Sequence, residues 1–341
     1  MIKSSKNVAI IIPYFGAFPK NFVTFLDSCK TNRYIDWIII TDEIVKVEDI
    51  PVNVHIIHET FGSVQKKIKK AVGWNDIVLD TSYKLCDYRP VYGVAFSDYI
   101  SGYNYWGYSD IDVVYGDLWK FIKRGVVNGY DKIGHLGHLT LFKNTEEINN
   151  RYRLPTIYNG KKRYLYREAF STSKACHFDE DWGINIIYNQ YGFLTYENSN
   201  IVNEPFPENM DLRSIDNRYL RLPQVYVYSK GHCKFFYREA ETISVEEFGY
   251  FHFQKRLFTD YLYKPHDVFY VNSSGYHALD SINKEVVSSI INKKSSLMSR
   301  IKYMKRTYMN TNWFTDRKLF NHYFPIKHIY NRIFKEKNFF I

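Results

Sequence analysis

Two aspartates, Asp110 and Asp112, stand one residue apart in an apolar and aromatic run, "NYWGYSDIDVVYGDLWKF" (residues 104–121). Carboxylate oxygens at the exit of a strand suit a hard cation such as Mg²⁺ or Mn²⁺, which in turn neutralises a diphosphate. Acids of a surface turn are the competing interpretation of so short a pattern. Because apolar and aromatic residues flank the pair on both sides, we favour a metal site. Asp117 is predicted to be the N-cap of the helix that follows.

A second acidic cluster, Asp179, Glu180 and Asp181, precedes "WGIN". A carboxylate within hydrogen-bond reach of an acceptor hydroxyl can act as its general base. Acids in the first turn of a helix would instead stabilise that helix through its dipole. Three acids exceed what capping requires, so all three are candidate catalytic residues. Glu180 and Asp181 fit the role best, and the sequence does not separate these two.

A compact polar group in "YKLCDYRP" could contact a phosphorylated ligand; it consists of Lys84, Asp87 and Arg89. We predict that Arg89 contacts a phosphate or orients Asp110. A structural salt bridge to Asp87 is the alternative for Arg89. Lys84 is predicted to contact the same ligand.

Three segments together resemble a bacterial family of glycosyltransferases. They are "WGYSDIDVVYGD", "YKLCDYRPVYG" and, far downstream, "YFHFQKR". The family comprises GT-A-type, nucleotide-sugar-dependent enzymes from capsule and O-antigen loci, and the resemblance covers residues 8–256. It implies a Rossmann-like GT-A domain, a nucleoside-diphosphate sugar donor, and a divalent cation, Mn²⁺ or Mg²⁺, held at Asp110 and Asp112.

The resemblance also implies roles for the residues of "HFQKR". His252 matches the C-terminal histidine that completes the metal site in many GT-A enzymes, and Lys255 and Arg256 would face the leaving diphosphate. Neutral imidazole is a competent ligand for Mn²⁺, and a Lys–Arg pair stabilises negative charge on a leaving diphosphate. A hydrogen-bonded histidine within a strand is the alternative interpretation of His252.

Continuous β-branched runs indicate buried parallel strands at Val8–Ile12, at Asp36–Asp42 and in "NVHIIHE". Helical spacing of apolar residues follows in "NFVTFLDSCK" and "SVQKKIKKAVG". Ligands of such α/β sheets lie beyond the carboxyl ends of the strands. There Tyr14 could stack on a nucleobase or pack in the core, and Asp42 could bond to the base or the ribose.

The predicted fold class is α/β of GT-A (Rossmann-like) type, a mixed, mostly parallel sheet flanked by helices with a helical C-terminal extension. No Gly-rich phosphate loop follows the first strand, which argues against the usual dinucleotide and P-loop folds. Further on we expect a strand in "KIGHLGHLTLFKN" and a hairpin that turns at Lys230–Gly231. That strand is placed on the acceptor side with His138, for which a core histidine is the alternative. The simplest partition is a catalytic domain over 1–275 and an extension over 276–341.

The formal net charge of +10 resides in one segment of the chain. From Lys293 onward there are twelve Lys and Arg against two acids, whereas 34 basic and 34 acidic residues precede it. Basic and apolar residues alternate there at helical spacing, which is typical of helices on anionic membrane surfaces, at about 1 kcal/mol per cation. Packing of such a helix on the domain is the alternative. Nucleic-acid binding fits less well, because no recognised nucleic-acid module accompanies the charge.

Cysteine usage and hydropathy indicate where the chain works. The four cysteines, at 29, 86, 176 and 233, form no CxxC pair, which argues against a zinc knuckle or a disulfide framework and fits a reducing compartment. The apolar run near the N-terminus breaks at Pro13 without a small-residue cleavage site, so we expect a first strand there. No stretch approaches the roughly 18 apolar residues of a membrane helix. We therefore expect a cytoplasmic protein, peripheral on the inner face of the bacterial cytoplasmic membrane.

Taken together, these features predict a metal-dependent hexosyltransferase of polysaccharide biosynthesis. It would move a sugar from a nucleotide donor, with UDP favoured, to a growing capsular or O-antigen glycan or a lipid-linked acceptor. The acids at 179–181 resemble the element that deprotonates the acceptor in inverting GT-A enzymes, so inversion is favoured; without a base there, retention stays open. The alternative is a non-catalytic membrane- or nucleic-acid-associated protein that acts through its cationic tail.

Overall fold

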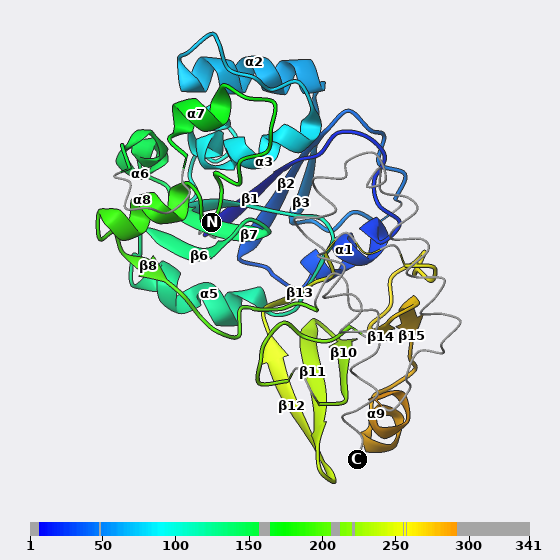
Figure 1. The fold of residues 1–341 in the computed structure, drawn as a ribbon. Helices are drawn as coiled ribbons and strands as arrows, with labels where there is room; N and C mark the ends of the chain where they lie inside the picture. The colour runs from blue at the N-terminus through cyan, green and yellow to red at the C-terminus, as the bar shows by residue number, and fades with distance from the viewer. Residues whose placement is uncertain are drawn as a thin grey trace, which may run out of the picture.

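The computed structural model describes residues 7–47, 49–156, 164–205, 212–219, 222–254, 256 and 258–291. Within these residues the strands form three sheets, of seven, five and three strands (Figure 1). Figure 1 shows the five-stranded sheet below the seven-stranded one, with β13 between them. The predicted extension beyond Ile291, Lys293 onward, lies outside the described residues.

The seven-stranded sheet has the order β3-β2-β1-β4-β7-β6-β8. Its strands are β1 (Val8–Pro13), β2 (Ile35–Thr41), β3 (Val54–His58), β4 (Tyr105–Ser109), β6 (Lys132–Leu136), β7 (Leu139–Lys143) and β8 (Thr195–Tyr196). Neighbouring strands from β3 to β4 are parallel, β7 is antiparallel to both β4 and β6, and β8 is parallel to β6. The sheet is therefore mixed and mostly parallel, and the predicted α/β class is confirmed.

Helices cover both faces of this sheet because alternate side chains of its strands enter different cores. Ala9 and Ile11 of β1 pack on one side, and Ile10 and Ile12 on the other. The first core is closed by α2 (Phe61–Val72), α3 (Leu85–Tyr88), α4 (Tyr92–Ala95), α6 (Glu146–Asn150), α7 (Tyr166–Phe170) and α8 (Ile184–Gln190). The second is closed by α1 (Phe22–Cys29) and α5 (Leu118–Val127). Short 3-10 turns lie at Ser82–Lys84, Arg89–Val91 and Arg151–Arg153.

The five-stranded sheet is antiparallel and aromatic. Its strands are β10 (Gln224–Ser229), β11 (His232–Glu239), β12 (Thr242–Phe248), β14 (Val268–Asn272) and β15 (Gly275–Ala278). The predicted hairpin is confirmed, since Ser229 pairs with His232 and both Lys230 and Gly231 have positive φ, as a two-residue turn requires. Helix α9 (Lys284–Ile291) covers one face. The sheet continues past residue 275, where the catalytic domain was predicted to end.

The smallest sheet joins the two larger ones. It has the order β5-β13-β9, with β5 (Val113–Tyr115), β13 (Tyr250–His252) and β9 (Val202–Asn203). Directly after β5, a Cβ at Gly116 would lie 2.7 Å from the backbone nitrogen of Cys233 and 3.0 Å from the carbonyl oxygen of Phe248. A glycine is required there because β5 leaves its sheet in contact with the backbone of the five-stranded sheet.

The segment "KIGHLGHLTLFKN" is a hairpin, and its prediction as a single strand is wrong. Gly134 has a φ of +80°, the register shifts after Ile133, and Leu136 pairs with Leu139 across a two-residue turn. A residue with positive φ interrupts the alternation of a continuous strand. The turn itself consists of Gly137 and His138, and it lies at the carboxyl end of β4.

No helix within the described ranges is long and apolar enough to cross a membrane.

Candidate metal and donor site

The register of the three-stranded sheet brings three distant segments together. Asp110 and Asp112 lie in the turn between β4 and β5. In the antiparallel pair of β13 and β5, His252 lies opposite Val113. In the parallel pair of β13 and β9, the neighbouring Phe251 lies opposite Asn203. Asp112, His252 and the residue after Asn203, which is Glu204, are therefore close neighbours at one end of the small sheet.

The predicted trio of Asp110, Asp112 and His252 does converge. The Nε2 atom of His252 lies 3.3 Å from Oδ1 of Asp112 and 3.9 Å from Oδ2 of Asp110. The two carboxylates are partly exposed, at 33 % and 30 %, whereas the imidazole is buried. One ligand atom from each residue lies within 4.8 Å of the others, a spacing that one cation could span. Two carboxylates and one imidazole suit Mn²⁺ better than Mg²⁺, which prefers oxygen ligands alone.

The charges around His252 favour the protonated, positively charged form of its ring. Burial lowers the pKa of His252, but the hydrogen bond and charge of Asp112, helped by Glu204 and Asp110, outweigh burial and raise this pKa to about 10. A ring surrounded by three carboxylates holds its second proton firmly. A divalent cation that replaces this proton would meet the same negative field.

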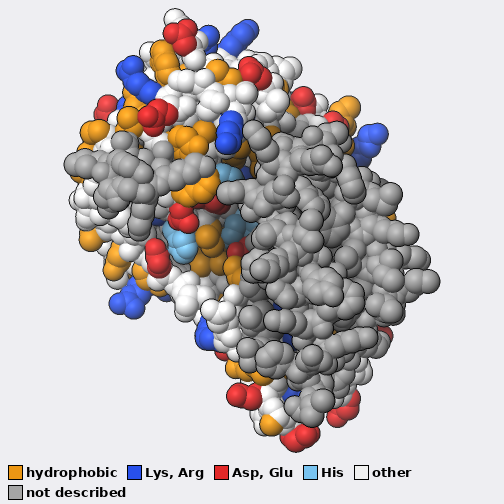
Figure 2. All heavy atoms as spheres, viewed as in Figure 1, with side chains coloured by type: hydrophobic (Ala, Val, Ile, Leu, Met, Phe, Trp, Pro, Cys, Tyr) orange, Lys and Arg blue, Asp and Glu red, His pale blue; other side chains and the backbone are white. Residues whose placement is uncertain are grey.

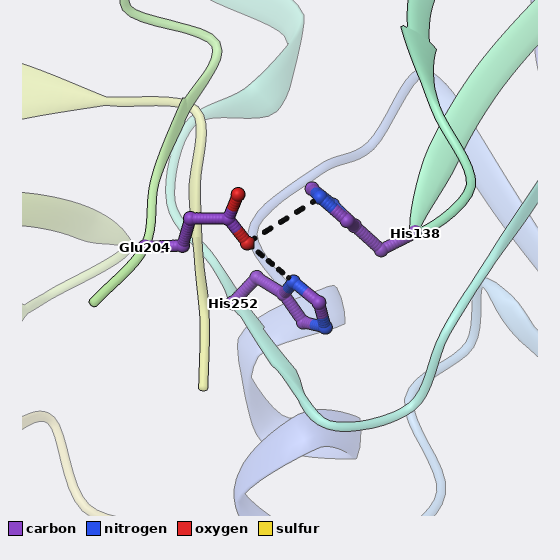
Figure 3. Close-up of side chains that lie close together, drawn as sticks. All are labelled: His138, Glu204 and His252. Carbon is purple, nitrogen blue, oxygen red and sulfur yellow. Dashed lines mark hydrogen bonds and ion pairs between the residues drawn. The ribbon is translucent and has the colours of Figure 1, made fainter. Parts of the chain in front are cut away.

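Glu204 and His138 lie beside His252, and Figure 3 shows both histidine rings next to one carboxylate oxygen of Glu204. Oε2 of Glu204 lies 2.9 Å from Nδ1 of His252 and 3.6 Å from Nε2 of His138. Both histidines and Glu204 are buried. His138 was predicted as an acceptor-side or core residue, whereas Glu204 was missed, because "VNEPF" contains no motif that would single it out.

Arg89 links the Asp110 pair to the second acidic cluster. Its Nη2 is paired with Oδ1 of Asp110, and its Nη1 donates to Oδ2 of Asp179 at 2.8 Å and to the carbonyl oxygen of Gly137 at 2.7 Å. The guanidinium also lies over the ring of Tyr108, 5.5 Å from its centroid. Of the two interpretations of Arg89, the contact with Asp110 is the one observed.

The three acids of the cluster occupy different environments. Asp179 is buried, which raises its pKa to about 7 even though the charge of Arg89 opposes the rise. Oε1 of Glu180 accepts from the backbone nitrogen of Gly137 at 2.8 Å, and its side chain is 35 % exposed. Asp181 is exposed and accepts from Nδ2 of Asn185 at 3.2 Å. A Cβ at Gly137 would lie 2.9 Å from Oδ2 of Asp179, so the glycine leaves room for this cluster.

The alternative of helix-dipole stabilisation does not describe these acids. Helix α8 begins at Ile184 with Gly183 as its N-cap, and its first turn contains no acidic residue. The backbone around the cluster is held instead by Tyr108, whose hydroxyl donates to the carbonyl oxygen of Asp179 at 2.8 Å. The cluster therefore lies in a structured loop beside the carboxyl end of β4.

Tyr14 and Asp42 lie at the ends of β1 and β2, as predicted. The ring of Tyr14 stacks on Phe18 with centroids 5.3 Å apart. Burial, and then the charge of Asp112, raise the pKa of Tyr14. Asp42 is exposed and accepts from the backbone nitrogen of Gly16 at 3.5 Å.

Lys84 does not fit its predicted role as a residue that contacts the nucleotide-sugar donor. Its ammonium is buried and donates to Oδ2 of Asp87 at 2.6 Å and to the carbonyl oxygens of Ala169 and Lys174 at 2.7 and 2.6 Å. Three acceptors use all three donors of an ammonium. Asp87 also accepts from the backbone nitrogen of Phe178 at 2.9 Å, so the pair anchors the loop that leads into the acidic cluster.

The structure describes one of the two basic residues that were predicted to face the leaving diphosphate. Lys255 lies outside the described residues. Arg256 is buried, and its charge opposes the rise of the pKa of Tyr226, a residue in the aromatic core of the five-stranded sheet.

The site as a whole combines a candidate cation position with ionised and aromatic groups around it. Figure 2 shows histidine side chains beside acidic and apolar ones in the middle of this face. Such an arrangement can hold a divalent cation, bind a phosphorylated ligand through that cation, and accept a proton at a nearby carboxylate.

Comparison with known proteins gives the chain a family. No curated protein matches it. Residues 10–280 match the model of a family of unknown function, DUF6625, and this range includes Asp110, Asp112, the acidic cluster, Glu204 and His252. The match spans most of the 341 residues. The chain therefore belongs to DUF6625, a family of unknown function.

Proposed function

We propose that this protein is a metal-dependent glycosyltransferase of the GT-A type. The observation that carries the proposal is the convergence of Asp110, Asp112 and His252 at the carboxyl end of β4. Catalytic and ligand-binding groups of α/β folds gather at such ends. The resemblance of the surrounding segments to enzymes of capsule and O-antigen loci supports the same class.

In this proposal Asp110, Asp112 and His252 would hold Mn²⁺ or Mg²⁺, which supplies charge neutralisation for the diphosphate of the donor. A UDP-linked sugar is the favoured donor. Tyr14 and Asp42 stand where strands β1 and β2 end, and they would contact the base and the ribose. Arg89 keeps Asp110 oriented through the ion pair described above.

Glu180 is the proposed general base toward the acceptor. Burial raises the pKa of this carboxyl, but the hydrogen bonds from His177 and the backbone of Gly137 outweigh burial and lower it. An ionised and partly exposed carboxylate is able to accept a proton. As the acceptor oxygen forms its bond to the anomeric carbon, its proton passes to Glu180, the bond from that carbon to the diphosphate breaks, and the nucleoside diphosphate leaves. This single displacement inverts the anomeric centre.

The experiment is a thermal-shift screen of nucleotide sugars with and without Mn²⁺, followed by assay of nucleoside diphosphate release. A donor that binds only with the cation should raise the melting temperature only when both are present. Replacing Asp112 by Asn removes a ligand and should lower turnover by roughly 10²-fold or more, since even indirect partners of a metal cost 10–100-fold.

Asp98→Asn is the matched control, because Asp98 is exposed and precedes β4, whereas the site lies at the carboxyl end of that strand. That variant should retain both donor binding and turnover. Full activity of Asp112→Asn, or of the wild type in excess chelator, would contradict the proposed function.

A further inference from the structure

His252 presents its two ring nitrogens to two different sets of acids. Nε2 faces Asp112 and Asp110, the proposed cation ligands. Nδ1 faces the opposite way, toward Oε2 of Glu204 at 2.9 Å (Figure 3). A ring can bind a cation through one nitrogen only if that nitrogen is free of its proton. What the other nitrogen contacts therefore decides whether His252 is ready to bind.

Glu204 provides an acceptor for that other nitrogen. The same Oε2 atom accepts from Nε2 of Gln254 at 2.6 Å, which is a donor-only amide nitrogen. Because Oε2 of Glu204 is a hydrogen-bond acceptor, it favours a proton on Nδ1 of His252, which can then donate to it. When a cation displaces the proton of Nε2 and Nδ1 keeps its own, the lone pair of Nε2 is directed to the position beside Asp112 and Asp110. Carboxylate partners of this kind fix the tautomer and ring orientation of metal-binding histidines.

His138 holds this arrangement from the side. Its ring stacks on that of His252 with centroids 4.0 Å apart and an interplanar angle of 29°. Its own Nδ1 shares a hydrogen bond of 2.8 Å with the hydroxyl of Tyr250, and its Nε2 lies 3.6 Å from Glu204. Because His138, Glu204 and His252 are all about nine-tenths buried or more, water does not compete freely for these contacts.

We propose that Glu204, supported by His138, is a positioning residue that sets the tautomer and orientation of His252 for cation binding. This inference rests on the cation site of the proposed function. It adds two supporting residues to that site, Glu204 directly after β9 and His138 in the β6–β7 turn. The three buried side chains also lie close enough to hold an ion themselves. The hydrogen bonds of Oε2 to both His252 and Gln254 favour the positioning role, and the experiment separates the two.

The test measures Mn²⁺ affinity, from the electron paramagnetic resonance signal of free Mn²⁺, for the wild type and for Glu204→Gln. The variant should bind Mn²⁺ 10–100-fold more weakly. A ¹⁵N spectrum of histidine-labelled protein loaded with Zn²⁺, a diamagnetic cation that binds imidazole, provides a second readout. It should show His252 protonated at Nδ1 in the wild type, and a loss of that preference in Glu204→Gln, whose amide can donate to Nδ1.

Glu247→Gln is the matched control. Glu247 makes a similar contact, 2.7 Å from Nδ1 of His232, on the five-stranded sheet and outside the site. Its replacement should leave Mn²⁺ affinity unchanged.

Each contrary result has a separate meaning. Equal Mn²⁺ affinity in Glu204→Gln, or a cation-loaded wild type in which His252 is protonated at Nε2 and not at Nδ1, would overturn the positioning role and leave the proposed function standing. Retention of Mn²⁺ by Asp112→Asn together with its loss in His138→Ala would place the ion in the buried trio and also overturn the role. Absence of Mn²⁺ and Mg²⁺ binding by the wild type would instead overturn the proposed function.

Discussion

Lys132 is a buried cation directly behind the acidic cluster. Its Nζ donates to Oδ1 of Asn185 at 2.6 Å and to the carbonyl oxygen of Gly134 at 2.9 Å. Asn185 in turn donates to Asp181 at 3.2 Å and to the carbonyl oxygen of His135 at 2.7 Å. Burial lowers the pKa of Lys132 to about 8, although the charges of Glu197 and Asp181 oppose the shift. The ammonium is therefore held in a place that penalises its charge.

Stability should consequently rise with pH between about 8 and 10 through this residue. The unfolded chain keeps the proton of Lys132 in this range while the folded chain loses it, and stability rises with pH wherever the unfolded state binds more protons. The full effect of the shift is about 3 kcal/mol. We expect the free energy of unfolding, measured in urea, to increase more with pH for the wild type than for Lys132→Met across this range. Parallel pH curves for the two proteins would contradict the assignment.

Among the helices, strands and turns, those that depend on a few adjacent residues were predicted from the local sequence pattern. The β-branched runs of β1 and β2, the helical spacing of α1 and α2, and the Lys230–Gly231 turn each depend on a few adjacent residues, and all were found. Strand β9 has two residues, and its pairing with β13 is decided by contacts between segments far apart in the sequence. Glu204 could not be predicted for this reason. Two of the three acceptors of Lys84, the carbonyl oxygens of Ala169 and Lys174, likewise come from a segment remote from it.

The predicted N-cap at Asp117 is confirmed, and its contribution to α5 can be measured. Its side chain accepts from the backbone nitrogen of Lys120 at 3.2 Å, and α5 closes one core of the large sheet. Asp117→Ala should lower the free energy of unfolding by about 1 kcal/mol, because one backbone donor loses its partner. Asp117→Asn, an equally good cap, should cost far less. Urea unfolding checks both variants, and equal stability of the alanine variant and the wild type would be the contrary outcome.

At the scale of the whole molecule, charge and site are separated along the chain. The candidate site lies in the first 256 residues, which belong to the part of the chain with equal numbers of acidic and basic residues. The entire net charge of +10 comes from Lys293 onward, outside the described residues. We propose that this segment attracts an anionic membrane surface, which would bring the site to a lipid-linked acceptor.

Charge reversal tests this division in the full-length chain. The variant Lys302→Glu, Lys305→Glu, Arg306→Glu should lose about 3 kcal/mol or more of vesicle binding, since each cation contributes about 1 kcal/mol at an anionic surface. Co-sedimentation with vesicles of anionic and of zwitterionic lipid measures the loss, which should shrink as salt screens the attraction. The control reverses three exposed lysines of α2, at positions 66, 69 and 70, and should bind vesicles as the wild type does. Because neither variant replaces a residue of the proposed site, both should still turn over donor with a soluble acceptor. Unchanged vesicle binding by the first variant would show that the charge serves another purpose, such as packing on the domain.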